Sequence, residues 1–103
     1  MKINIKSTNL ELTEAIRDYV QEKMDMLDKY LGNIDVINCD FEVALTTNHH
    51  LKGEIYRAEA NIEVPGSLLR IDKTEKNLYK AIDKVKDHLA QMIVKHKEKQ
   101  RER

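Results

Sequence analysis

The sequence predicts an α+β fold, a two-layer sandwich in which two helices lie on one face of a four-stranded mixed sheet. Two observations lead to this fold class. Four stretches carry apolar residues at every second position, and two carry them at every third or fourth position, as strands and amphipathic helices do. These stretches follow the order β-α-β-β-β-α. Because the strands share one apolar face and each helix has one apolar stripe, we expect both helices to cover that face.

The first third of the chain predicts a short strand followed by a helix. Ile3 and Ile5 alternate with polar residues over positions 1–6, and we expect positions 7–9 to break the strand. Thr13 is a suitable N-cap for a helix that ends at Gly32, a residue able to adopt positive φ. The apolar face of this helix comprises Ile16, Val20, Met24, Leu27 and Leu31, the solvent face is acidic, and one flank carries Ala15, Tyr19, Lys23, Met26 and Tyr30.

The middle of the chain predicts three strands. Ile37, Cys39, Phe41, Val43 and Leu45 alternate with polar residues, a polar loop covers positions 47–53, and a second alternating stretch runs from position 56 to 64. Pro65-Gly66 suits a type II turn. A short fourth strand is expected over positions 69–72, and Thr74 is the expected cap of the last helix.

The strand connections follow from these elements. The first strand-helix-strand unit should form a right-handed crossover, which makes the first two strands parallel neighbours, and hairpins should connect the rest. The second sheet face is expected to be polar and open, with Asn38, Asp40, Glu42, Arg57, Glu59, Asn61 and Glu63 on it.

The last third of the chain, positions 77–103, carries two stripes at helical spacing. One is apolar and should pack on the sheet: Leu78, Ile82, Val85, Leu89, Met92, Ile93 and His96. The other is mostly basic and flanks the first: Lys80, Lys84, His88, Gln91, Lys95 and Lys99. Residues after about 97 are expected to form a frayed basic tail.

Length and composition indicate one small soluble domain. The chain has 103 residues, of which 41% are hydrophobic and 35% charged, as in globular proteins. The single cysteine, Cys39, cannot form an internal disulfide and lies on an apolar strand face, where a structural thiol is expected. No apolar run has the length of a membrane span, and the N-terminus does not resemble a signal peptide. We therefore expect a cytoplasmic protein without a membrane contact.

Charge is distributed unevenly although the formal net charge is zero. Positions 1–72 hold 8 Lys and Arg against 13 Asp and Glu, whereas positions 73–103 hold 10 against 5. Such asymmetry indicates an anionic partner, and a solvated helix end explains it equally well. Four lysines in one stripe suit phosphate groups, since binding releases counterions from the nucleic acid. Tyr19 and Tyr30 suit base stacking or, as we expect, packing against the last helix.

The sequence contains no arrangement typical of catalysis. Ser7 and Ser67 are expected in turns, and the three glycines are too dispersed to cradle a phosphate. His49-His50 lacks the further ligands that a zinc site needs. We therefore expect no enzyme activity, no small-molecule substrate, no cofactor and no metal.

Almost the whole chain resembles the ribosome hibernation-promoting factor family, also called the ribosome-associated inhibitor or cold-shock translation inhibitor family. The resemblance rests on four segments in a characteristic order: MKINIKSTNLELTEAIRDYV at positions 1–20, Val64-Pro65-Gly66, NLYKAID at positions 77–83 and KHKEK at positions 95–99. It implies a fold similar to double-stranded RNA-binding domains with an added leading strand.

The resemblance also implies a function. Family members bind the small ribosomal subunit and its ribosomal RNA near the decoding region under stress or in stationary phase, exclude messenger and transfer RNA, and so inhibit translation. We expect residues 1–103 to be a single ribosome-binding domain, monomeric off the ribosome and similar to the short form of the family. The predicted RNA-binding residues are Arg17, Lys23, Lys80, Lys84, His88, Gln91, Lys95, Lys97, Lys99 and Arg101.

The sequence departs from the family at positions where basic residues are usual. His88, Gln91 and Val94 occupy such positions on the last helix and Met26 on the first, while Lys80 and Lys84 add charge elsewhere on the stripe. The alternative hypothesis is a protein-interaction module that docks a basic protein on its acidic surfaces or pairs through a sheet edge, with no RNA role.

Overall fold

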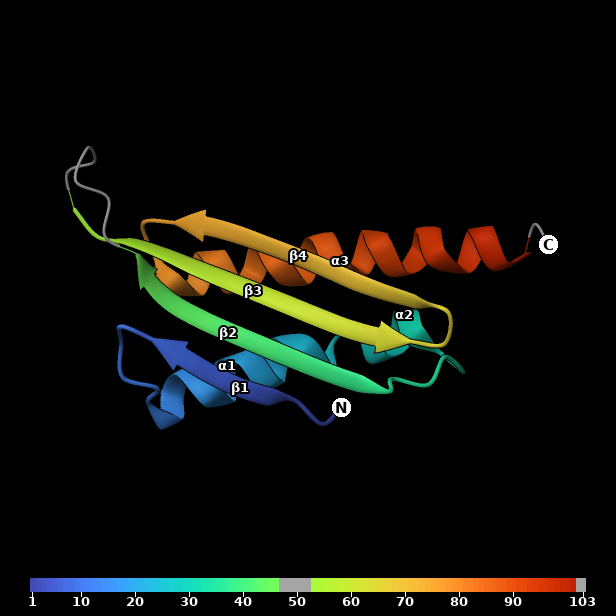
Figure 1. Cartoon of the computed structure of the whole chain (residues 1–103), viewed down its shortest axis with the longest axis horizontal. Helices are drawn as coiled ribbons and strands as arrows, with labels where there is room; N and C mark the ends of the chain where they lie inside the picture. The colour runs from blue at the N-terminus through green and yellow to red at the C-terminus, as the bar shows by residue number, and fades with distance from the viewer. Residues whose placement is uncertain (47–52, 102–103) are drawn as a thin grey trace.

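The computed structural model describes residues 1–46 and 53–101 and has the predicted α+β architecture (Figure 1). Two helices and a short helical turn lie on one side of a four-stranded sheet. In chain order the elements are β1 (Asn4–Thr8), α1 (Glu14–Asp25), α2 (Asp28–Leu31), β2 (Asn38–Thr46), β3 (Ile55–Val64), β4 (Ser67–Glu75) and α3 (Leu78–Arg101).

The sheet has the predicted topology. Its strand order is β1-β2-β3-β4, with β1 parallel to β2 and the other neighbours antiparallel. The registers align Ile5 with Phe41, Phe41 with Ala60, and Ala60 with Ile71. Because partners across a ladder share a face, these four side chains form one apolar row across the sheet.

The core lies between this face and the helices. Val20 and Met24 of α1 are fully buried, as are Val85, Leu89 and Ile93 of α3. α3 packs mainly against β3 and β4, whereas α1 contacts α3. The apolar stripe expected on the last helix is confirmed for Leu78, Ile82, Val85, Leu89 and Ile93, and Ala81 joins it in the core. Met92 packs against the core while half-buried, and His96 is half-buried outside the core cluster.

The long first helix predicted by the apolar spacing is interrupted. Helix α1 ends at Asp25, and the N–H groups of Met26 and Leu27 bond three residues back instead of four, to Lys23 and Met24. This tightening redirects the chain into α2, yet Leu27 and Leu31 remain buried. The spacing of the buried apolar residues is therefore the same as in one continuous helix, so the sequence pattern does not indicate where the helix is interrupted. Gly32, with φ of 57°, ends α2 as predicted for the end of the helix.

Two strands differ in extent from the prediction. β1 begins at Asn4, three residues later than expected, and ends at Thr8, two residues later than expected, because Ser7 and Thr8 pair with Val43 and Ala44. Asn9, which has φ of 61°, follows its end. Strand β4 runs from Ser67 to Glu75 because it pairs with β3 along its whole length. Ser7 and Ser67, both expected in turns, therefore lie in strands, because the ladders extend over them.

The ends of two further elements also differ from prediction. Thr74 lies in β4 and cannot cap α3. That role falls to Asn77, whose side-chain oxygen accepts from the Lys80 N–H at 3.2 Å. Ile37 precedes the first ladder residue of β2, and its side chain is 59% exposed, contrary to the expected apolar face. Helical backbone continues beyond Lys97 to Arg101, where a frayed tail was expected.

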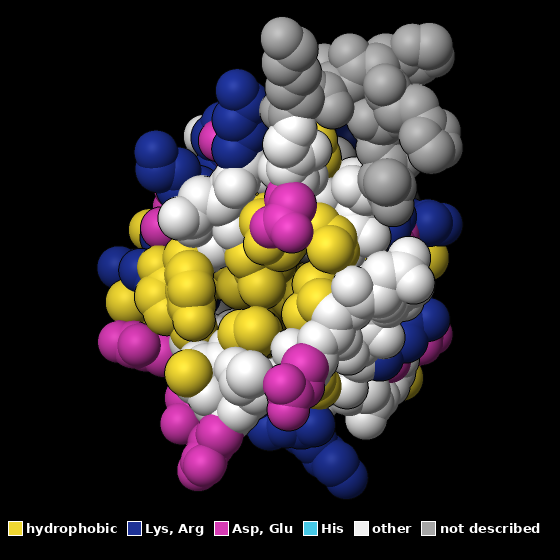
Figure 2. Space-filling model, turned by 90° about the vertical axis from the view of Figure 1, so that its left-hand side faces the viewer, with side chains coloured by type: hydrophobic (Ala, Val, Ile, Leu, Met, Phe, Trp, Pro, Cys, Tyr) yellow, Lys and Arg dark blue, Asp and Glu magenta, His cyan; other side chains and the backbone are white. Residues whose placement is uncertain are grey.

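Apolar side chains reach the surface at the end of the sandwich where α1 and α3 begin. Figure 2 views this end, where hydrophobic side chains line a hollow between the elements. Leu10, Ile16, Tyr56 and Leu78 contribute to it, and the carboxylate of Glu54 lies at the same site. Among residues 1–46 and 53–101, no helix is long and apolar enough to cross a membrane.

Leu89 provides a test of the core. Replacement by Ala should lower the free energy of unfolding by about 2–5 kcal/mol, since the side chain is fully buried and its removal leaves a cavity. Leu68→Ala is the matched control, because that side chain is 59% exposed and should change stability by less than about 0.5 kcal/mol. Urea denaturation measures both, and equal losses would contradict this packing.

Candidate nucleic-acid interface

The basic stripe lies along the side of α3 that borders the edge strand β4. Lys84 Nζ lies 2.5 Å from Glu75 Oε2 near the end of β4, and this contact lowers the pKa of Glu75. One turn further, His88 and Gln91 share a small hollow with Lys73 of β4. The stripe therefore borders the sheet edge and faces solvent.

The members of the stripe differ in how available they are. Lys80, Gln91, Lys95 and Lys99 are exposed, and His88 is half-buried. Within the described ranges, no carboxylate lies within ion-pair distance of Lys95 or Lys99, whereas Lys84 is paired with Glu75. Lys84 is therefore the stripe lysine that is already engaged, whereas Lys95 and Lys99 are exposed toward the end of α3.

The structure separates the two predicted α1 residues from this stripe. Lys23 faces the opposite flank of α3, where its Nζ lies 3.5 Å from Asp83 and 5.3 Å from the centre of the Tyr19 ring. The Gln21 amide donates to the Met1 carbonyl at 2.7 Å, so this face of α1 lies toward β1. Because Arg17 is one turn before Gln21 on the same face, it also lies on the β1 side. The stripe and these two residues do not form one continuous patch.

The two remaining candidates lie near the end of α3. Lys97 Nζ donates to the Tyr30 carbonyl at 2.8 Å, which satisfies a free acceptor at the end of α2. This contact gives Lys97 a structural role that the sequence did not indicate. Arg101 is exposed at the last described turn.

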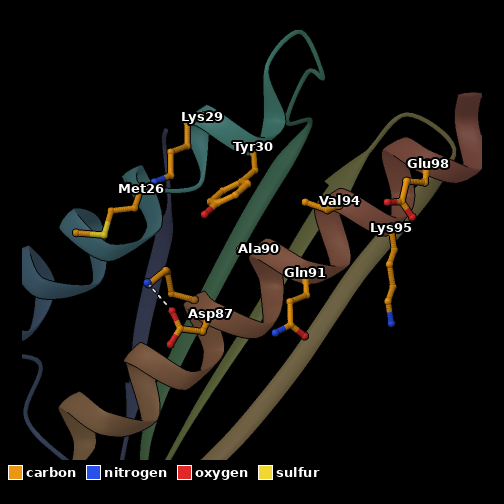
Figure 3. A pocket seen from close by; sticks show the side chains of 10 residues that line it. Met26, Lys29, Tyr30, Asp87, Ala90, Gln91, Val94, Lys95 and Glu98 are labelled. Carbon is orange, nitrogen blue, oxygen red and sulfur yellow. Dashed lines mark ion pairs between the residues drawn. The ribbon is translucent and has the colours of Figure 1, made fainter.

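A groove separates α1 and α2 from α3 on the helical side of the molecule (Figure 3). Its volume is roughly 740 Å³. Apolar atoms come from Met26, Tyr30, Ala90 and Val94, and the charged rim comprises Lys29, Lys86, Asp87, Lys95 and Glu98. The sequence placed Met26 and Tyr30 on one flank of the predicted helix but did not indicate a groove. Lys29 on α2 and Lys86 on α3 were missed because which residues line the groove depends on how the two helices pack.

A cluster around Tyr19 connects the two sides of the helical layer. The Tyr19 hydroxyl donates to Asp83 Oδ1 at 2.7 Å, and its ring meets Tyr79 edge to face with centres 4.7 Å apart. The hydrogen bond to Asp83, followed by burial, raises the pKa of Tyr19 to about 12. Tyr19 therefore packs against the last helix, as expected, and is not offered for base stacking.

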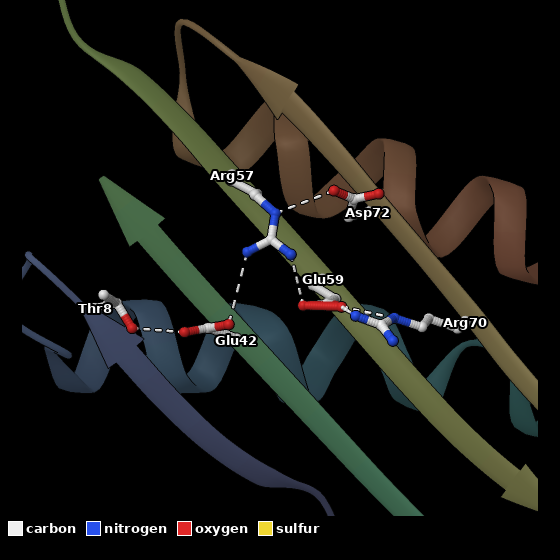
Figure 4. A network of polar contacts seen from close by, with 6 residues as sticks. All are labelled: Thr8, Glu42, Arg57, Glu59, Arg70 and Asp72. Carbon is white, nitrogen blue, oxygen red and sulfur yellow. Dashed lines mark hydrogen bonds and ion pairs between the residues drawn. The ribbon is translucent and has the colours of Figure 1, made fainter. Parts of the chain in front are cut away.

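The open face of the sheet carries a network of ion pairs (Figure 4). Glu59 is only 7% exposed and is held by Arg57 and Arg70, each at 2.7 Å. Arg57 also reaches Asp72 at 3.0 Å and Glu42 at 3.7 Å. These charges largely satisfy one another, so this face offers a partner less free charge than its composition suggests.

The described residues offer little to chemistry or to metals. No group of three or more His, Cys, Asp or Glu among them is placed to hold a metal ion. The pair His49-His50 lies outside the described residues. Burial raises the pKa of Cys39 to about 11, which suits the expected structural thiol and disfavours a nucleophile.

Comparisons with known proteins agree with the expected family. The family model for sigma 54 modulation protein / S30EA ribosomal protein matches residues 3–101. A ribosome hibernation promoting factor of Azotobacter vinelandii is 35% identical over 103 residues, which covers 100% of this chain and 89% of that protein. A ribosome hibernation promotion factor of Deinococcus radiodurans is 33% identical over 93 residues, which is 90% of this chain and 47% of that longer protein.

Solved structures share the fold. The N-terminal domain of Thermus thermophilus Protein Y superposes with a TM-score of 0.67 at 32% identity, covering 90% of this chain and 98% of that domain. A ribosomal subunit interface protein from Coxiella burnetii has a TM-score of 0.71 at 18% identity and supports the fold alone.

The Tyr19–Asp83 contact makes a prediction about pH. The pKa of Tyr19 is raised to about 12 in the folded protein, whereas a tyrosine in an unfolded chain has a pKa of ~10. The contribution of the Tyr19–Asp83 hydrogen bond to the free energy of unfolding is therefore complete below pH ~10 and disappears as the pH rises through about 12. Tyr19→Phe should lower the free energy of unfolding by about 1 kcal/mol at neutral pH, because it removes one hydrogen bond. It should also remove a tyrosine that ionises near pH 12. Ultraviolet absorbance titration detects that ionisation. Asp83→Asn, which keeps the ring contacts, should shift it to lower pH, and an unshifted titration would contradict the assignment.

Proposed function

Since the chain belongs to the sigma 54 modulation protein / S30EA ribosomal protein family, we propose that it is a ribosome hibernation factor that binds the small ribosomal subunit near the decoding region. The observation that carries this proposal is the solvent-facing basic stripe on α3, in a chain whose net charge is zero. Relatives named as ribosome hibernation factors support it. By occupying that region, the protein would block messenger and transfer RNA and so inhibit translation.

The proposed RNA contacts follow the stripe. Lys80, Lys95, Lys99 and Arg101 would neutralise phosphates directly, and Lys84 would do so when it exchanges Glu75 for a phosphate. His88 and Gln91 would add hydrogen bonds between these cations. Lys23 and Lys97 hold α1 and α2 against α3, so they would support the RNA-binding surface mainly by keeping these helices in place. Arg17 would contribute only to RNA that reaches the β1 side.

The shape of α3 suits a sequence-independent contact. Its 24 residues extend about 36 Å, long enough to follow several phosphates of a folded RNA. Lysines contact phosphates as flexible point charges, which fits recognition of shape and backbone. Inhibition would then require only occupancy, in keeping with a family of non-enzymatic factors. We propose that the protein acts in the cytoplasm and is monomeric when it is not on the ribosome.

Removal of stripe charges should reduce both affinity and its salt dependence. The double variant Lys95→Ala/Lys99→Ala should weaken binding to purified small subunits and lower the slope of log affinity against log salt by roughly one to two units. Sedimentation at a series of salt concentrations provides the measurement.

Lys2→Ala/Lys6→Ala is the matched control, because it removes the same charge from exposed positions on the β1 side. Its salt slope should equal that of the unmodified protein. Equal losses in the two double variants would mean that the stripe is not the contact surface. Absence of binding at low salt would refute the proposed function, and retention of a protein partner after nuclease treatment would favour the protein-interaction alternative.

Occlusion of messenger makes a separate prediction. Addition of the protein to small subunits should displace a bound labelled messenger fragment, with a midpoint that follows the affinity of each variant. The filter-binding signal should fall with the unmodified protein and with Lys2→Ala/Lys6→Ala, and much less with Lys95→Ala/Lys99→Ala. Binding without displacement would retain the ribosome contact and exclude the decoding region.

A further inference from the structure

The groove between the helices exposes apolar side chains that no other residue among 1–46 and 53–101 covers. Met26 is 40% exposed and Val94 41% exposed, and both line the groove with Tyr30 and Ala90.

Tyr30 contributes an aromatic ring to this groove, and its contacts with neighbouring residues restrict its position. Its side chain is half-buried and packs against the hydrophobic core, as expected, and it also lines the groove with Ala90 and Val94 of α3. The ring extends from α2 toward α3 (Figure 3), and Lys29 Nζ lies 5.2 Å from the ring centre. The Tyr30 carbonyl accepts from Lys97 of α3 at 2.8 Å, which ties its backbone to the opposite helix. A ring positioned in this way loses little conformational freedom when a planar group stacks on it.

Positive charge exceeds negative charge among the residues that line the groove, which favours an anionic chain as the partner. The cations are Lys29, Lys86 and Lys95, and the carboxylates are Asp87, which pairs with Lys86 at 2.5 Å, and Glu98. Lys95 belongs both to the rim and to the basic stripe, so a strand bound along the stripe passes the mouth of the groove.

We propose that this groove receives an unstacked base of single-stranded RNA, which stacks on Tyr30 and contacts Met26 and Val94. The inference rests on the proposed function and adds a ligand subsite to it. A base in a duplex has no free face to offer, so the subsite requires a loop or a single strand. Stacking accepts every base, so we expect little sequence preference.

A tryptophan at position 30 reports on stacking directly, because the chain contains no other tryptophan. The emission of a Tyr30→Trp variant should be quenched by a uridine decanucleotide and not by an RNA duplex of similar length. Leu68→Trp, on an exposed position of β4, is the control and should not be quenched. Equal quenching of the two variants, or none in Tyr30→Trp at saturating RNA, overturns the proposal.

Affinity for small subunits separates this subsite from the function as a whole. Tyr30→Leu should weaken binding by roughly 5- to 150-fold with an unchanged salt slope, since it removes a stacking contact and no charge. Tyr30→Phe, which keeps the ring, should bind normally. Equal binding by Tyr30→Leu and the unmodified protein, with loss in Lys95→Ala/Lys99→Ala, overturns the groove subsite and leaves the proposed function standing. Failure of the unmodified protein to bind refutes the proposed function itself.

Discussion

Burial of one sheet face under α1 and α3 is the constraint on which the rest of the structure depends. The row formed by Ile5, Phe41, Ala60 and Ile71 needs cover across all four strands, and no single helix is wide enough to supply it. Two helices side by side meet this need and leave a groove between them. The same requirement directs the polar residues of β2 and β3 to the opposite face, where Arg57 and Glu59 pair. The polar open face of the sheet and the polar outer side of the helices therefore both follow from the burial of the apolar residues between them.

The distribution of charge explains how a neutral chain can present a basic surface. Acidic side chains of the open sheet face are engaged by Arg57 and Arg70, and Asp83 is engaged by Tyr19 and Lys23 between the helices. Lys95 and Lys99 stand apart from these pairs on the outer side of α3. Since potential at a surface depends on nearby charges more than on the net charge, α3 can attract phosphates while the chain as a whole is neutral.

Sequence reasoning succeeded where a feature depends on local periodicity and failed where it depends on pairing. Thr13 caps α1 through the Ile16 N–H, as its position predicted. Thr74 was misassigned because pairing with β3 holds it in a strand, and a single sequence does not reveal how far a hairpin extends. The break after Asp25 was missed because a tightened turn preserves the spacing of buried residues. The basic stripe was predicted residue by residue, yet the engagement of Lys84 and Lys97 required knowledge of what lies opposite them.

The sequence by itself determined the fold class, the strand order, the buried stripe of α3 and the side of that helix on which the lysines lie, because periods of two and of three to four residues are properties of the chain alone. Only the tertiary structure decided which cations are already engaged, that Arg17 and Lys23 lie away from the stripe, and that Met26 and Tyr30 face Val94 across a groove. Those facts depend on residues distant in sequence, such as Tyr30 and Lys97, whose approach is set by how two helices pack on a shared sheet.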